Sequence, residues 1–129
     1  MDYSQLKVGQ QLTSRTFALE REAVAAYISA VEDASPLYAD GRWVPPTTVA
    51  ALGLKGILEE LEVPGGTVHL GQELEFLEAV EIGESLTCNA TIAQNSVRGQ
   101  WRFLSVAVEV YAGNGRPVLK GRSTIIVPV

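Results

Sequence analysis

Residues 33–61 read DASPLYADGRWVPPTTVAALGLKGILEEL, and the second half of this stretch decides the fold. Residues 49–61 have the composition of a helix that is apolar on every side, and such a helix must be enclosed by other parts of the protein. Gly53 and Gly56 each destabilise a helix by about 1 kcal/mol relative to alanine. We therefore expect a strand or a ligand to approach the helix backbone closely at these two glycines.

The rest of the chain predicts one more helix and five strands. Residues 11–18 alternate weakly and are rich in threonine and serine, which favours a first strand. From Glu20 apolar residues recur at helical spacing, and this helix should end near Asp33 because Pro36 disfavours a helical residue before it. Alternation predicts four further strands at 67–77, 84–93, 100–111 and 117–127. This order predicts an α+β protein with a single domain, residues 1–129, in which an antiparallel sheet wraps around a long central helix, the hot-dog arrangement.

The composition excludes several classes of function. A net charge of -5 and a pI near 4.8 argue against nucleic acid, because phosphate binding needs clustered lysine and arginine. No apolar run reaches the roughly 18 residues that span a bilayer, and the N-terminus lacks a signal-peptide pattern, so we expect a cytoplasmic protein without membrane association. The one cysteine, Cys88, excludes an internal disulfide and is expected to be a small buried hydrophobe. With one histidine, His69, and no glycine-rich phosphate loop, we expect no metal and no cofactor.

Three stretches in the middle of the chain carry motifs of a known family. Residues 66–76 read GTVHLGQELEF and precede VEIGESL at 80–86, residues 33–38 read DASPLY, and residues 44–47 read VPPT. Together they resemble the MaoC-like branch of the hot-dog superfamily, which includes (R)-specific enoyl-CoA hydratases and 3-hydroxyacyl dehydratases. The first stretch resembles the family's first meander strand, the second its hydratase motif Asp-x-Asn-Pro-x-His, and the third the entry to its central helix.

The hydratase motif departs from that of active family members. In active members its Asp and His act together on the water that adds to, or leaves, the double bond of an acyl thioester. Asp33 matches the acid, whereas Tyr38 stands at the position of the histidine and Ser35 at that of the asparagine. A phenol with a pKa of about 10 is a poor general base at neutral pH, unlike an imidazole with a pKa of about 6.5.

The entry to the central helix departs as well. Active members usually have a His-Gly pair whose glycine N–H polarises the thioester carbonyl, and this pair aligns with Pro45 and Pro46. Proline has no N–H, and loss of one such donor lowers a rate about 100- to 1000-fold. The N–H groups of Thr47 and Thr48 are candidate substitutes at the helix N-terminus, and either threonine is also expected to be the N-cap. Trp43 beside the proline pair either covers a ligand or fills the core.

The candidate residues also have structural interpretations. Asp33 and Tyr38 are the catalytic candidates, but an aspartate also caps turns and a tyrosine after a proline turn is typical of packing. His69 shares the parity of Glu73 and Glu75, which favours an exposed or interface position over a base. The resemblance implies substrate-binding roles for a second group: Ser35, Trp43, Pro46, Thr47 and Thr48.

Three functional hypotheses follow. A tyrosine in the motif and a Pro-Pro-Thr entry resemble the non-catalytic half of double hot-dog dehydratases, which makes room for the acyl tail. The favoured hypothesis is therefore the substrate-accommodating subunit of a heteromeric (R)-specific enoyl-CoA hydratase or 3-hydroxyacyl dehydratase. The alternatives are a self-sufficient homodimeric hydratase that uses Asp33, and a non-catalytic module that binds acyl thioesters. Under all three, the resemblance implies a homodimer or a heterodimer with a catalytic MaoC-like subunit, and a thioester of CoA or acyl-carrier protein. Whether the chain alone is an enzyme stays open.

Overall fold

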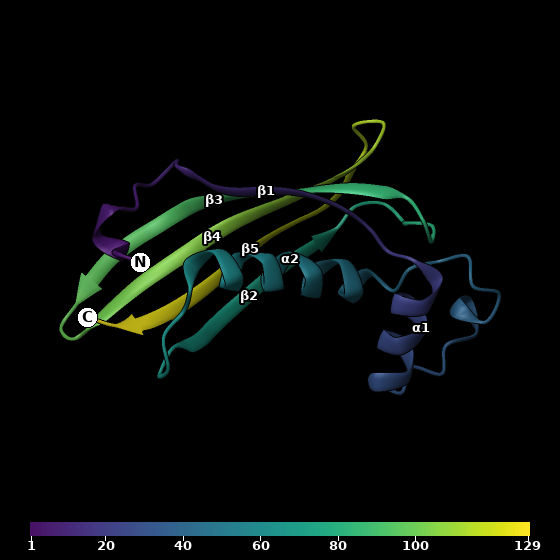
Figure 1. The fold of residues 1–129 in the computed structure, drawn as a ribbon, viewed down its shortest axis with the longest axis horizontal. Helices are drawn as coiled ribbons and strands as arrows, with labels where there is room; N and C mark the ends of the chain where they lie inside the picture. Colours follow the sequence, from purple (N-terminus) through teal and green to yellow (C-terminus); the bar gives the residue numbers. More distant parts are fainter.

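A computed structural model describes residues 1–129 as one antiparallel sheet crossed by a long helix (Figure 1). The helical elements are η1 (Tyr3–Gln5), α1 (Arg21–Ala30), η2 (Pro36–Tyr38) and α2 (Pro46–Leu61). The strands are β1 (Gln11–Ala18), β2 (Val68–Phe76), β3 (Ser85–Arg98), β4 (Trp101–Ala112) and β5 (Pro117–Pro128). They are ordered β1-β3-β4-β5-β2. The predicted α+β architecture of a sheet around a central helix is confirmed.

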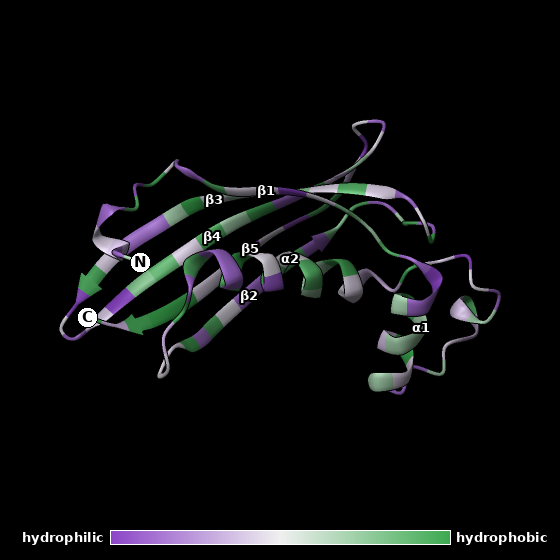
Figure 2. Cartoon of the chain, in the orientation of Figure 1, coloured by the Kyte–Doolittle hydropathy of each residue, from purple (hydrophilic) through white to green (hydrophobic).

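The middle of the sheet follows the predicted alternation of apolar residues. In β4 the side chains of Leu104, Val106 and Val110 are 0%, 1% and 0% exposed. Trp101, on the opposite parity, is 43% exposed. Figure 2 shows the same pattern as hydrophobic bands along β3, β4 and β5. None of the helices is long and apolar enough to cross a membrane.

The inner side of α2 packs directly on the sheet. Ile57 and Leu61 are 2% and 0% exposed. A Cβ on Gly53 would lie 3.5 Å from the Sγ of Cys88, and a Cβ on Gly56 would lie 3.5 Å from Arg15. Strands do approach the helix at both glycines, at ordinary contact distances that would also admit an alanine methyl group. Cys88 is buried as expected, and this burial raises the pKa of its thiol.

The ends of both long helices differ from the prediction. α1 ends at Ala30, three residues before Asp33, because a Schellman motif with Glu32 at φ 55° closes it. The Asp33 N–H donates to the carbonyl of Ile28 at 3.1 Å. α2 begins at Pro46 with Pro45 as its N-cap, so neither Thr47 nor Thr48 caps it. Proline suits the first helical position, because its fixed φ is already helical and it lacks only an N–H that would be unpaired there.

β2 is the edge strand of the sheet, and all nine of its residues are exposed. A bulge between His69 and Gly71 changes the alternation within it. His69 pairs with Ile125 of the core, and Gln72 accepts a hydrogen bond from the hydroxyl of Ser123, so both face α2. The parity inferred for His69 was therefore wrong. Val68, which pairs with Ile126, faces away from α2.

Candidate functional site

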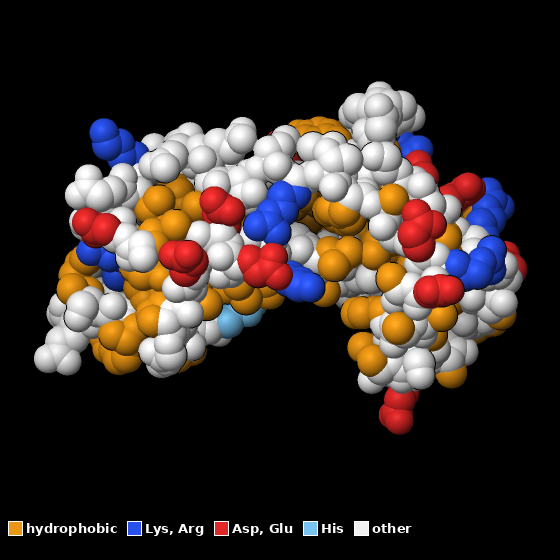
Figure 3. All heavy atoms as spheres, in the orientation of Figure 1, with side chains coloured by type: hydrophobic (Ala, Val, Ile, Leu, Met, Phe, Trp, Pro, Cys, Tyr) orange, Lys and Arg blue, Asp and Glu red, His pale blue; other side chains and the backbone are white.

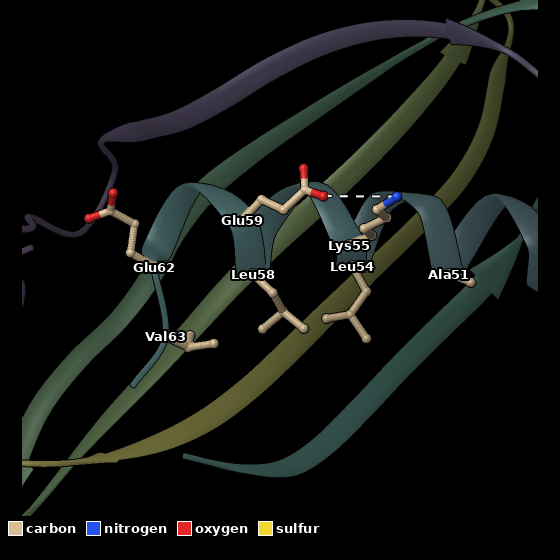
Figure 4. A pocket seen from close by; sticks show the side chains of 7 residues that line it. All are labelled: Ala51, Leu54, Lys55, Leu58, Glu59, Glu62 and Val63. Carbon is tan, nitrogen blue, oxygen red and sulfur yellow. Dashed lines mark ion pairs between the residues drawn. The ribbon is translucent and has the colours of Figure 1, made fainter. Parts of the chain in front are cut away.

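An open groove runs along the outer side of α2 (Figure 4). It has a volume of about 520 Å³ and is lined by Ala51, Leu54, Lys55, Leu58, Glu59, Glu62 and Val63. In Figure 4 the side chains of Leu54, Leu58 and Val63 point to one side of the helix, and Lys55 and Glu59 form the opposite rim. The Nζ of Lys55 lies 3.9 Å from a carboxylate oxygen of Glu59. The groove therefore offers an apolar wall with charges along one side.

This groove exists because the sheet encloses only part of the helix. α2 packs against β1 and β5, while β2 beyond them stays exposed along its whole length. Figure 3 shows hydrophobic side chains gathered along the same side of the molecule. The expectation that α2 is fully enclosed is right for its inner side and wrong for the side that carries Leu54 and Leu58, which are only partly buried.

The Asp33 side chain is engaged in the turn after α1. One of its carboxylate oxygens accepts the backbone N–H of Ser35 at 2.9 Å. The hydroxyl of Ser35 in turn accepts the N–H of Leu37 at 3.4 Å and begins the short helix η2. Asp33 and Ser35 thus form the local turn that their sequence pattern allowed. A catalytic role for Asp33 stays a prediction.

Tyr38 and Trp43 line one cavity on the α1 side of the molecule. Its volume is about 260 Å³, and Val24 and Ile28 of α1 contribute to it. The guanidinium of Arg42 lies over the Trp43 ring, 4.4 Å from its centre. The structure therefore joins the aromatic residues to α1 and not to the start of α2.

Pro46 lies on a different, much smaller cavity of about 10 Å³ that it shares with Val49 and Phe76. The N–H of Thr48 donates to the carbonyl of Pro45 at 2.9 Å, and its buried hydroxyl has no partner. The N–H of Thr47 makes no hydrogen bond within the chain. Of the two candidate substitute donors for the absent Pro46 N–H, Thr47 is therefore the free one.

Tyr27 is a residue of this region that the sequence did not single out. Its hydroxyl donates to the Oγ1 of Thr47 at 2.8 Å and links α1 to the first turn of α2. In the sequence, the spacing of Tyr27 places it on the apolar face of α1. Its hydroxyl is the only feature that could have indicated a hydrogen bond to another element. Neither of these two residues lines any of the five main cavities, and neither does Asp33.

The candidate residues are not gathered in one cavity. Tyr38 and Pro46 line separate cavities, and Asp33 is held in its own turn. No group of three or more histidine, cysteine, aspartate or glutamate side chains is suited to hold a metal ion. What the chain presents is an apolar groove along α2, with one free backbone N–H at the N-terminal end of the helix.

Comparison with known proteins identifies relatives of this arrangement. Residues 7–120 match the family described as FAS1-like, dehydratase domain region. An (R)-specific enoyl-CoA hydratase of Aeromonas caviae is 26% identical over 140 residues, which cover 99% of this chain and 100% of the relative. The solved (R)-hydratase from A. caviae involved in PHA biosynthesis has a TM-score of 0.81 at 22% identity, covering 96% of this chain and 98% of that one.

A second solved structure comes from a complex. It is the C-terminally truncated HadBC (3R-hydroxyacyl-ACP dehydratase) complex of Mycobacterium tuberculosis, and the match has a TM-score of 0.68 at 22% identity. It covers 87% of this chain and 90% of that one. These likenesses confirm the predicted hot-dog fold. The resemblance inferred from the three motifs is confirmed as well.

Proposed function

The chain belongs to the FAS1-like, dehydratase domain region family, and from this premise we propose that it is a substrate-accommodating hot-dog subunit. It binds the acyl thioester of an (R)-specific enoyl-CoA hydratase or 3-hydroxyacyl dehydratase, and a companion hot-dog with an intact Asp and His performs the chemistry. One observation carries this proposal. The acyl-sized groove along α2 is present, while Tyr38 and Pro46 line separate cavities.

The groove suits an acyl chain. Its volume of about 520 Å³ falls within the roughly 300–1,000 Å³ of small-molecule sites. Leu54, Leu58 and Val63 offer an apolar wall, and each methylene removed from water there contributes about 0.8 kcal/mol. We assign the tail of the thioester to this wall.

Two groups that active members use for hydration are replaced in this chain. Adding water to an enoyl thioester requires a base that takes a proton from water and a donor that stabilises charge on the carbonyl oxygen. Tyr38 is a phenol at the position of the base, and Pro46 has no N–H at the position of the donor. The free N–H of Thr47 is one donor where an oxyanion site generally uses two. These absences favour binding without turnover.

We assign the companion to the edge strand β2. An exposed edge of unpaired N–H and C=O groups is a template for another strand, and β2 is exposed at all nine residues. The HadBC relative was solved as a complex, which supports a paired arrangement here. Pairing at β2 would also enclose the open side of the groove.

The test measures hydration of crotonyl-CoA and, separately, binding of butyryl-CoA, which cannot be hydrated. We expect the purified chain to bind butyryl-CoA in calorimetry and to show no hydratase activity. Adding a hot-dog protein that carries the full Asp-x-Asn-Pro-x-His motif should produce activity. Hydration by the chain alone at ordinary enzyme rates, or absence of any binding, contradicts the proposal.

A further inference from the structure

The cavity on the α1 side differs in charge from the other cavities of the chain. Its 9 lining residues include Arg21 and no aspartate or glutamate. Each of the other four main cavities is lined by at least one glutamate. The cavity shares no residue with the groove along α2, and Figure 1 shows α1 beyond the N-terminal end of that helix. In a chain with a net charge of -5, it is therefore a separate site with a positively charged lining.

Two polar groups of this cavity have no partner within the chain. The guanidinium of Arg21 takes part in none of the six ion pairs and donates no hydrogen bond. The hydroxyl of Tyr38 makes no hydrogen bond either, whereas the other three tyrosines all donate one: Tyr3, Tyr27 and Tyr111. A guanidinium has five N–H donors and no acceptor, and a phenol can also donate. Both unused donors are therefore free to bind an acceptor in this cavity.

The backbone holds both donors at the cavity. A Cβ on Gly41 would collide with the Nη1 of Arg21 and would lie 3.1 Å from its Cζ. The φ of Gly41 is 69°, in the left-handed region that glycine adopts without strain. A glycine at this position therefore leaves room for the guanidinium. Tyr38 is the last residue of η2, which begins at the turn formed by Asp33 and Ser35. The turn that resembles the hydratase motif thus holds its tyrosine at this cavity.

The rest of the lining suits a small, flat, apolar group. Val24 and Ile28 of α1, together with Ile82, give an apolar wall, and Trp43 adds an aromatic ring. Aromatic rings pair favourably with one another in offset-stacked or edge-to-face arrangements. The volume of about 260 Å³ lies below the roughly 300–1,000 Å³ of sites for drug-sized molecules. The cavity therefore fits a ligand with a single ring.

From these observations we propose that the cavity binds a small aromatic carboxylate, one ring that carries one carboxylate group. The ring packs against Trp43 and the apolar wall of α1. The carboxylate accepts hydrogen bonds from the Arg21 guanidinium, whose planar shape matches a carboxylate, and from the Tyr38 hydroxyl. This site goes beyond the proposed function, because it lies outside the acyl groove and does not depend on thioester binding. Failure of either proposal leaves the other standing.

Titration of the isotope-labelled chain with benzoate, followed by NMR, tests the site. The chain has two tryptophans, Trp43 and Trp101, and each gives one indole N–H signal. The spectrum of Trp101→Phe assigns the two signals. Benzoate should shift the Trp43 signal saturably and leave the Trp101 signal unchanged, because Trp101 begins β4 and lines none of the five main cavities. No saturable shift at Trp43, or equal shifts at both, overturns the proposal.

Two variants and two further ligands separate the contributions to binding. Arg21→Gln should weaken benzoate binding about tenfold or more, and Tyr38→Phe about three- to tenfold, the effect of one hydrogen bond. Arg98→Gln is the matched control, because Arg98 is exposed and lines none of these cavities, and it should leave the affinity unchanged. Acetate keeps only the carboxylate and benzyl alcohol only the ring, so both should bind more weakly than benzoate. Equal affinities of the wild type and either cavity variant, or binding of acetate or benzyl alcohol as tight as that of benzoate, overturn the proposal.

Discussion

Both sides of α2 carry large apolar side chains, but the fold treats them differently. Ile57 and Leu61 on the inner side are 2% and 0% exposed against the sheet. Leu54 and Leu58 on the outer side line an open groove. The two sides are distinguished by glycine, because Gly53 and Gly56 lie on the side where β1 and β3 come close. α2 thus packs into the protein's own core with one side and leaves an open groove with apolar side chains along the other.

The largest expected effect is the removal of a side chain from the inner side. Ile57→Ala should lower the free energy of unfolding by about 2–5 kcal/mol, because it leaves a cavity in a close-packed core. Urea denaturation monitored by circular dichroism measures this loss. The variant should bind butyryl-CoA normally wherever it remains folded, since Ile57 does not line the groove.

Leu58→Ala is the matched change on the outer side. Leu58 is only partly buried, so its truncation should lower stability by about 1 kcal/mol or less. It should instead weaken the binding of butyryl-CoA, and more strongly for longer acyl chains. A stability loss as large as that of Ile57→Ala would show that the outer side is also part of the core and would remove the contrast between the two sides.

Much of this fold could be predicted from local patterns. The alternation in residues 100–111 gave the buried face of β4, and the glycines of α2 indicated the approach of strands. The cap of α2 was missed because Thr47 and Thr48 fit a general preference, while the tighter constraint came from Pro46 in the first helical position. When two nearby positions are both acceptable starts for a helix, residue preferences taken one at a time cannot predict which start the protein uses.

The site was harder to predict than the fold, and β2 shows why. Periodicity assigned His69 to the face of Glu73 and Glu75, and one extra residue in the strand reversed that assignment. A bulge has no reliable sequence signal, because the partner strand decides where the pairing slips. The separation of Tyr38 from Pro46 likewise depends on how η2 packs against α1, which no motif encodes.

Tyr3→Phe should lower the free energy of unfolding by about 1 kcal/mol, because the variant loses one hydrogen bond to the C-terminal end of α2. The Tyr3 hydroxyl donates to the carbonyl of Leu61 at 2.8 Å and lies 3.2 Å from that of Glu62. Burial, and then the charge of Glu62, raise the pKa of Tyr3. The stabilisation from the neutral phenol is therefore complete below the unfolded pKa of about 10 and is lost as the pH rises through the folded pKa.

Thermal unfolding at pH values on both sides of that range checks the Tyr3 prediction. The melting temperature of the wild type should be higher than that of Tyr3→Phe at neutral pH, and this difference should shrink in strong alkali. A constant difference at all pH values would mean that the phenol contributes only by packing.

Gly53→Ala should raise the free energy of unfolding by less than about 1 kcal/mol, because alanine favours a helix and its methyl group fits. The added Cβ would lie 3.5 Å from the Sγ of Cys88 and 3.7 Å from Val108, which are ordinary contacts. Gly121→Ala is the control for a glycine that is sterically required, since its Cβ would lie 2.7 Å from the carbonyl oxygen of Glu73. Denaturation of both variants should give shifts of opposite sign. A lower free energy of unfolding for Gly53→Ala would show that the strands pack against α2 more closely than these contacts imply.

The smallest effect is expected at Arg15, whose guanidinium ties β1 to the end of α2. It lies 2.9 Å from a carboxylate oxygen of Glu59 and 3.5 Å from one of Glu60, and these side chains are about half exposed. Exposed ion pairs contribute little and are screened by salt. Arg15→Met should therefore lower the free energy of unfolding by less than any change above, and only at low ionic strength. Methionine keeps an unbranched side chain that can still lie over Gly56, where the Cδ of Arg15 would be 3.5 Å from an added Cβ. At high salt, Arg15→Ala should be less stable than Arg15→Met. Equal stability would mean that the packing of the Arg15 side chain on Gly56 contributes nothing. The inner side of α2 would then be held against the sheet by its apolar contacts alone.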